Sequence, residues 1–248
     1  MREAESYAQQ ISRLLYAKTD EKERFVRWLT DHLAGRSFEH ALDVGPGPGH
    51  VTGPLAAVAR HLTLVEKDPE YTDTLRAQFP AATVEPVAIQ DWQSHGQFFD
   101  FILYSQGLYY HDVTRWLPLC RALYETLKPG GELVIVLNSD EGDWWRILER
   151  CDSLRPHWSF NYQRASLFAE QLRSLGPLVV HPFGCKLTFD SADQLAEFIG
   201  RQAMQILDDA VVQANQSTFD ELAHVFIEQN HGPCIHLKSN IYVLTRNA

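Results

Sequence analysis

The 248-residue chain is 45% hydrophobic and carries 32 acidic against 22 lysine and arginine residues, which gives a formal net charge of −10. This length can bury one sizeable core, and the negative charge disfavours contact with a phosphate backbone, which depends on lysine and arginine. We therefore expect a soluble protein of one domain that has a small-molecule substrate, with no nucleic acid or membrane partner. The oligomeric state is left open, with a monomer favoured.

Cysteine usage and the amino terminus indicate the compartment. The four cysteines lie far apart without a C-x-x-C pair, so neither a metal site nor a disulfide framework is expected. The segment from Met1 to Ser6 is polar where a signal peptide would be apolar, and no apolar run reaches bilayer length. A cytoplasmic location is predicted.

Two helices are predicted before the first strand. The apolar positions at helical spacing are Tyr7, Ile11, Leu14 and Leu15 in the first helix and Phe25, Trp28, Leu29 and Leu33 in the second. Thr19 or Asp20 can cap the second helix, because its side-chain oxygen can accept from free amides of the first turn, and Gly35 can end it.

Beyond Gly35, short apolar runs alternate with amphipathic segments, which is typical of βα units and a parallel sheet. The predicted strands are 41–44, 62–65, 82–87, 99–104 and 132–137, and the predicted helices between them are 69–79 and 116–127. The turn 128–131 leads into the fifth strand. The fold class is α/β, with a Rossmann-like, doubly wound sheet.

The second half of the chain is predicted to be mainly helical. Helices are expected at 144–154, 192–199, 202–212 and 219–227, a strand at 178–187, and a closing pair of strands at 234–238 and 241–244. We divide the single domain 1–248 into an N-terminal helical lid (1–36), a cofactor-binding core (37–138), a substrate cap insertion (139–232) and closing strands (233–248).

A glycine-rich loop, Asp43 to Gly49, joins the first strand to a helix expected to begin near His50. Glycine allows a sharp turn and close approach of a ligand, and free amides at a helix start suit a carboxylate or phosphate. The G-x-G-x-G spacing departs from the nicotinamide fingerprint, because His50 stands where the third glycine belongs. Glu66 follows the next strand, where a carboxylate can accept from both ribose hydroxyls. Together these features favour an adenosine-bearing ligand.

Four motifs in this order resemble the class I S-adenosylmethionine-dependent methyltransferases. They are Leu42 to Gly49, Glu66, Phe99 to Ser105, and Leu127 to Leu133. The resemblance implies S-adenosylmethionine as cofactor and a seven-stranded sheet whose last strand is antiparallel. It places the methionine part beside Gly45, Gly47 and Gly49, the ribose at Glu66, and adenine beside Ile89 and Gln90. Pro46, Lys67 and Ser105 are further cofactor-binding candidates. Ala88 stands where members often have Asp, which leaves adenine recognition there to backbone groups, with Asp91 or Trp92 as a candidate helper.

A narrower resemblance is to histamine N-methyltransferase and related small-amine enzymes. It rests on Tyr7, Thr19-Asp20, the run from Gln106 to Tyr110, and Gly142 to Trp145. It implies that Gln106, Asp20 and His236 contact the substrate. Tyr109, Tyr110 and Trp144 are candidates to wall the pocket, since aromatic rings suit an aromatic or cationic substrate.

Methyl transfer to a neutral nitrogen needs positioning and no base, whereas a hydroxyl acceptor needs one. Gln106 and Asp20 are the candidate catalytic positions for a nitrogen acceptor, and His111 is the candidate base for a hydroxyl. Each has a structural alternative: Asp20 as a helix cap, the tyrosine pair and Trp144 as packing, and His111 as a turn residue. No metal is expected, because the histidines have no metal-ligand spacing.

The sequence therefore predicts a transferase that N-methylates a small amine or nitrogen heterocycle. O-methylation of a small molecule is the alternative within enzymes. A non-catalytic S-adenosylmethionine-binding module is the alternative from another class. A nicotinamide-dependent oxidoreductase is disfavoured by His50.

Overall fold

The structure, a computed structural model, describes residues 18–158, 161–203 and 205–247. Residues 23–138, 161–183 and 239–248 form one compact unit, which we call the core unit. Residues 1–22, 139–160 and 184–238 form a second one, the cap unit. The first predicted helix, around Tyr7 to Leu15, lies outside the described residues.

Seven strands form one sheet in the order β3-β2-β1-β4-β5-β7-β6. Their bounds are β1 Phe38–Val44, β2 Ala59–Val65, β3 Thr83–Glu85, β4 Phe99–Ser105, β5 Leu127–Glu141, β6 Leu178–Thr188 and β7 Cys234–Thr245. The pairs among β1 to β5 are parallel, and β7 runs antiparallel to β5. The α/β fold with an antiparallel last strand is therefore confirmed.

The strand register brings the ends of three strands to one level. Val44, at the end of β1, pairs with Val65 of β2 on one side and with Tyr104 of β4 on the other. The loops that follow these strands carry the glycine loop, Glu66 and Gln106. In a parallel sheet, ligands bind outside the carboxyl ends of the strands, so these loops are positioned for a common site.

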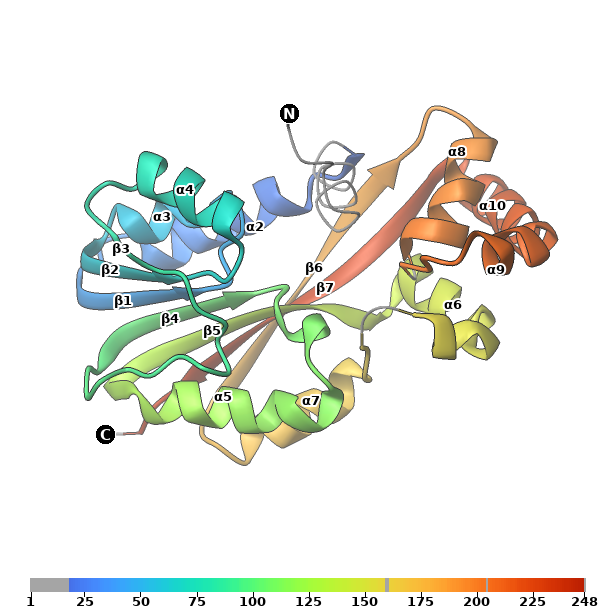
Figure 1. Cartoon of the computed structure of the whole chain (residues 1–248). Helices are drawn as coiled ribbons and strands as arrows, with labels where there is room; N and C mark the ends of the chain where they lie inside the picture. Colours follow the sequence, from blue (N-terminus) through green and yellow to red (C-terminus); the bar gives the residue numbers. More distant parts are fainter. Residues whose placement is uncertain (1–17, 159–160, 204, 248) are drawn as a thin grey trace. The chain divides into compact units, whose positions relative to one another are not determined.

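Helices cover both faces of the sheet in the core unit (Figure 1). One face carries α2 Glu21–Leu33, α3 Gly53–Ala56 and α4 Pro69–Gln78, and the other carries α5 Trp116–Glu125 and α7 Ala165–Arg173. The prediction for α2 is confirmed: Phe25, Leu29 and Leu33 are buried in the core beneath it. The Thr19 hydroxyl accepts from the Glu21 amide at 3.1 Å, as a capping residue does.

Two sequence predictions around the glycine loop and the fifth strand were wrong. The helix after the loop begins at Gly53, not near His50, and has only four residues. A turn separates it from the loop, in which the Thr52 amide donates to the Gly49 carbonyl at 3.3 Å. Residues 128–131, which were predicted as a turn, belong to strand β5. The pairing register of β5 with β4 shifts between Phe99 and Phe101. Between these pairs, residues 128–131 of β5 stand opposite the single residue Asp100 of β4, so the strand is irregular there.

In the second half, two further predictions were wrong and one helix was missed. The helix expected at 202–212 is broken, because Gln205 has a φ of +49° and the Asp208 side chain caps a new helix, α9 Asp209–Ala214. The closing pair of strands is the single strand β7, in which Ser239 keeps pairing with Asn138. Helix α7 went unpredicted, although Ala165, Phe168, Ala169 and Leu172 are buried at helical spacing.

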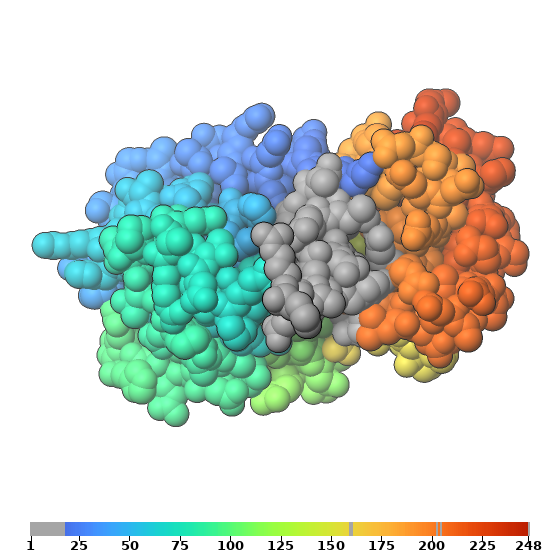
Figure 2. All heavy atoms as spheres, turned by 45° about the horizontal axis from the view of Figure 1, so that its top comes forward, coloured from blue at the N-terminus to red at the C-terminus, as the bar shows by residue number. Residues whose placement is uncertain are grey.

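The core unit also holds the 3₁₀-helices η1 Leu108–Tyr110 and η2 Val113–Arg115, and the remaining described helices belong to the cap unit. They are α6 Gly142–Arg150, the 3₁₀-helix η3 Asp152–His157, α8 Ala192–Glu197, the π-helix η4 Phe198–Ala203, α9 and α10 Gln216–Asn230. Figure 2 shows α8, α9 and α10, in orange and red, gathered into one body. In the described part of the chain, no helix has the length and apolar character needed to cross a bilayer.

The unit boundaries differ from the segments expected from the sequence. Residues 23–36 of the expected lid lie in the core unit, and so do residues 161–183 of the expected cap insertion. The strands β5, β6 and β7 each continue from one unit into the other.

Candidate functional site

Three glycines of the loop after β1 have a left-handed backbone conformation. Gly45, Gly47 and Gly49 have φ values of +61°, +56° and +81°. A Cβ built on Gly45 or Gly47 would meet no described atom within 4 Å, whereas one on Gly49 would lie 2.9 Å from the Phe79 ring and 3.0 Å from Leu75. The first two glycines therefore leave an open side for a ligand. The third allows the loop to pack against α4.

The carboxylate of Glu66 joins this loop to the end of β2. Its Oε2 accepts a hydrogen bond from the Gly47 amide at 2.9 Å, and its Oε1 accepts one from the Asp68 amide at 2.9 Å. The side chain is buried, while the neighbouring Lys67 is exposed. Because each carboxylate oxygen has a second lone pair, Glu66 can brace the loop and still accept from two hydroxyls.

The turn after β4 is held in a conformation that few residues adopt. Gln106 has a φ of +57°, and its amide donates to the Val136 carbonyl of β5 at 2.9 Å. A Cβ on Gly107 would collide with the Tyr104 ring, so this position needs glycine. A non-glycine residue with positive φ stores strain of about 1 kcal/mol or more, which is common at ligand sites.

Ser105 has a buried hydroxyl group whose hydrogen-bonding capacity is not satisfied within the described residues. Its hydroxyl oxygen is buried and has no hydrogen-bond partner among the residues that the structure describes. A buried unsatisfied hydroxyl costs about 1–3 kcal/mol. Its place at the end of β4, one residue before Gln106, makes it a candidate to contact a bound polar molecule, as the sequence predicted.

The two tyrosines after β4 differ in their surroundings. Tyr109 is buried and packs against Tyr162, with ring centroids 4.8 Å apart, and its hydroxyl accepts from the Asn138 amide at 2.5 Å. Tyr110 is 54% exposed. Tyr109 therefore fastens the turn to β5, while Tyr110 presents its ring to solvent.

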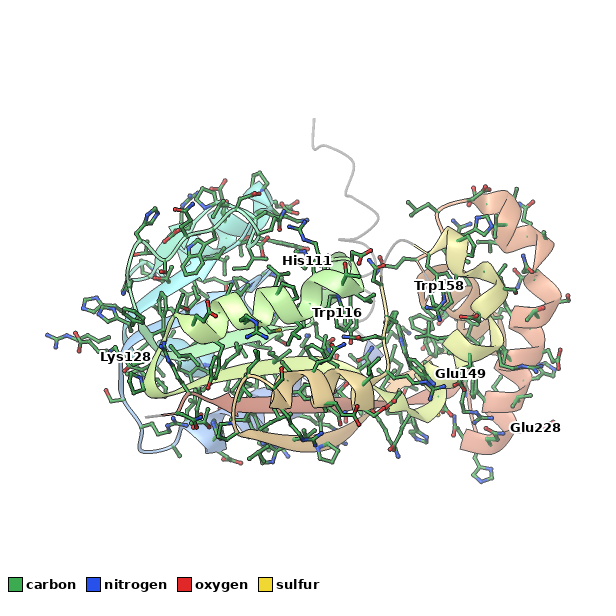
Figure 3. The ribbon with its side chains drawn as sticks, turned by 90° about the horizontal axis from the view of Figure 1, so that it is seen from below. His111, Trp116, Lys128, Glu149, Trp158 and Glu228 are labelled. Atoms are coloured by element: carbon green, nitrogen blue, oxygen red, sulfur yellow. The ribbon has the colours of Figure 1, made fainter. Side chains whose placement is uncertain are left out.

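His111 is half-buried just before α5, and Figure 3 labels it with Trp116 at one end of this helix, opposite Lys128. Burial, with the charges of Lys67 and Arg115, holds the pKa of His111 below its usual 6.5. The imidazole is therefore neutral at pH 7 and can accept a proton or a hydrogen bond.

The predicted adenine residues lie in the turn after β3. Ile89 lines a shallow hollow against α5 together with Trp92 and Leu123, and Gln90 is exposed. The Trp92 indole donates to the Glu85 carboxylate at 2.7 Å. This bond occupies Trp92, which the sequence offered as a helper in adenine recognition.

The other predicted substrate residues, Asp20, Trp144 and His236, belong to the cap unit. The Asp20 carboxylate accepts from the Lys186 amide at 3.1 Å. Trp144 is 6% exposed and packs on Phe198, with ring centroids 5.7 Å apart. The side chain of His236 is 56% exposed.

Asp143 joins three elements of the cap unit by hydrogen bonds. No role was predicted for it from the sequence. Its Oδ2 accepts from the Asn230 side chain at 2.9 Å and from the His236 amide at 2.8 Å, so one buried carboxylate joins α6, the end of α10 and β7. The signal in the sequence was an acid at the start of a predicted helix, where a carboxylate is favoured.

The residues of the core unit fit an adenosine-bearing cofactor with a methionine tail. Gly45 and Gly47 offer an open side, Glu66 has free acceptor capacity for ribose, and the buried Ser105 hydroxyl lacks a partner within the described chain. Across residues 18–158, 161–203 and 205–247, no group of three or more His, Cys, Asp or Glu side chains is arranged to hold a metal ion.

Comparison with known proteins agrees with this arrangement. Residues 41–131 match the family model of a methyltransferase domain. An uncharacterized methyltransferase of Mycobacterium tuberculosis is 30% identical over 121 residues, which is 46% of this chain and 46% of that protein. The chain thus spans less than half the length of the curated relatives that it matches.

Solved structures show the same fold over almost the whole chain. The YcgJ protein of Bacillus subtilis superposes with a TM-score of 0.65 at 15% identity and covers 91% of this chain and 99% of that one. The N-methyltransferase NodS of Bradyrhizobium japonicum, in complex with S-adenosylhomocysteine, gives 0.53 at 16% identity and covers 90% and 86%. Residues 41–131 thus match a methyltransferase domain, and this match indicates S-adenosylmethionine as the cofactor.

Proposed function

We propose that the whole chain is an S-adenosylmethionine-dependent methyltransferase that acts on a small molecule, at the nitrogen of an amine or heterocycle. The observation that carries the proposal is the glycine loop braced by Glu66 within a matched methyltransferase domain. When bound, the cofactor supplies an electrophilic methyl group. The protein supplies alignment of the acceptor with that methyl, which can contribute several kcal/mol.

The charge distribution supports an acceptor other than nucleic acid. The cap unit holds 17 acidic against 10 basic residues, a net charge of −7, and the core unit holds 15 against 12, a net charge of −3. A negative field repels phosphates and attracts cations. A neutral or cationic acceptor therefore suits such a protein better than one that carries phosphates.

Nitrogen as the methylated atom rests on Gln106, Asp20 and His236 and on the resemblance to small-amine N-methyltransferases. In this proposal Gln106 orients the acceptor by hydrogen bonding, and Tyr110 contributes to the wall of its pocket. Lys67, Ile89, Gln90 and Pro46 are proposed to border the cofactor. We also propose that the protein is cytoplasmic and monomeric.

O-methylation is the second candidate, and one observation favours it. His111 is held neutral beside Lys67, so its imidazole can take the proton of a hydroxyl while oxygen attacks the methyl group. His111→Ala should then abolish turnover and leave cofactor affinity unchanged, whereas a neutral nitrogen acceptor would react without this side chain.

Calorimetry with S-adenosylhomocysteine tests the first half of the proposal, because failure of the protein to bind it would overturn the assignment. A mass-spectrometric screen of amines, nitrogen heterocycles and phenols for products heavier by one methyl group tests the second half. Cofactor binding without any product across such a panel would instead identify a non-catalytic binding module.

A further inference from the structure

Asp43, one residue before the end of β1, is a buried carboxylate with a buried partner. Its Oδ2 accepts a hydrogen bond of 2.7 Å from the Thr52 hydroxyl, and the two residues are 1% and 0% exposed. A buried carboxylate is costly unless hydrogen bonds replace its hydration. The Thr52 hydroxyl is therefore a stabilising donor for Asp43.

This bond closes the glycine loop at its two ends. Residues 44–51, including all three loop glycines, lie between Asp43 and Thr52. Inside the loop, the Gly49 amide donates to the Pro46 carbonyl at 3.0 Å, and the Thr52 amide donates to the Gly49 carbonyl at 3.3 Å. Because glycine permits many backbone conformations, the shape of the loop depends on how firmly its ends are held.

We infer that Thr52 is a positioning residue for cofactor binding, through the hydroxyl that it donates to Asp43. The inference rests on the proposed function and adds to it a residue outside the G-x-G-x-G motif. Thr52 acts through Asp43 and need not touch the cofactor. Without the hydroxyl, the loop samples more conformations, and binding must then pay the entropy of ordering it.

Two variants separate the hydroxyl from the rest of the side chain. Thr52→Val keeps the shape and removes the donor, whereas Thr52→Ser keeps the donor. The Kd for S-adenosylhomocysteine, measured by calorimetry, should rise about tenfold in Thr52→Val, which corresponds to the loss of one hydrogen bond to a charged group. In Thr52→Ser it should stay within about twofold of the wild type.

Thr72→Val is the matched control. Thr72 is 2% exposed, and its hydroxyl donates to the Pro69 carbonyl at 2.8 Å within α4. This variant also loses a buried hydroxyl hydrogen bond, so its Tm should fall while its Kd for S-adenosylhomocysteine stays that of the wild type.

The possible outcomes are distinct. A Thr52→Val protein with a lower Tm and an unchanged Kd would overturn the inference alone and make Thr52 purely structural. Should Thr52→Val not fold, a tenfold loss of affinity in Thr52→Ser would overturn it, since the donor is still present there. Absence of binding by the wild type would overturn the proposed function, and the inference with it.

Discussion

The carboxylate of Glu66 accepts a hydrogen bond from the amide of Gly47 at 2.9 Å, so the residue after β2 and the middle of the glycine loop after β1 are joined directly. One side chain thus sets the spacing of two loops whose residues are 19 positions apart. The acidic residue that the sequence assigned to ribose also shapes the site into which the ribose would enter.

Glu66→Gln should weaken binding of S-adenosylhomocysteine. The amide group retains one acceptor oxygen and turns a donor toward either the Gly47 or the Asp68 amide, so one charge-assisted hydrogen bond is lost. Such bonds contribute about 1.5–3 kcal/mol, and calorimetry should show a Kd raised at least about tenfold. Glu70→Gln, in the first turn of α4, is the control. Equal affinities for Glu66→Gln and wild type would contradict the assignment.

Gly49→Ala should destabilise the fold. The residue has a φ of +81°, and the new Cβ would lie 2.9 Å from the Phe79 ring. We expect a loss of about 1–3 kcal/mol in the free energy of unfolding by urea. Gly53→Ala is the matched control, because a Cβ there would meet no described atom within 4 Å. It should be neutral, and comparable losses in both variants would show that the contact with α4 is unimportant.

His111 should titrate below pH 6.5. Burial, Lys67 and Arg115 all lower its pKa, so the imidazole stays neutral until the solution is more acidic than an ordinary histidine requires. NMR titration of its ring proton measures the midpoint, with the other histidine signals as internal reference. Lys67→Gln removes one of the causes and should raise the midpoint. No change in Lys67→Gln would mean that Lys67 lies too far away to act.

Glu132 should make the free energy of unfolding decrease as the pH falls through the acid range. Burial alone would raise the pKa of Glu132, but hydrogen bonds from His32 at 2.7 Å and Arg36 at 2.8 Å hold it at about 2. An acid with a lowered pKa contributes stability above its unfolded value of about 4.5 and loses it as the pH falls toward 2. The contribution is up to about 3 kcal/mol.

Urea unfolding across this pH range measures the effect of Glu132. In Glu132→Gln, the decline in stability between pH 4.5 and 2 should be shallower than in the wild type, while the exposed Glu125→Gln should follow the wild type. Parallel curves for Glu132→Gln and wild type would show that the pair with Arg36 contributes nothing.

The sequence predicted those parts of the fold that depend on local periodicity. The spacing of Phe25, Leu29 and Leu33 predicted α2, and five apolar runs predicted five strands. Hydrophobic spacing shows directly which face of a helix or strand is buried. The errors lie where the path of the chain depends on the backbone angles of single residues. The positive φ of Gln205 broke the helix that the apolar pattern favoured at 202–212.

The candidate site was predictable in its loops and less so in its contacts. Glycine spacing and an acid after a strand indicate where a cofactor binds, but the bonds of Thr52 with Asp43 and of Tyr109 with Asn138 join residues that no short motif connects. The position of Asp143 between three elements likewise depends on tertiary packing.

The position of β7 between β5 and β6 has a consequence for biosynthesis. β6 emerges from the ribosome about 50 residues before β7 but reaches the sheet only through β7. Until then the nascent chain carries an unpaired strand edge, which is prone to aggregation. A release of the chain before residue 234 would leave β6 without its neighbour, so translation must deliver β7 before the core unit can close.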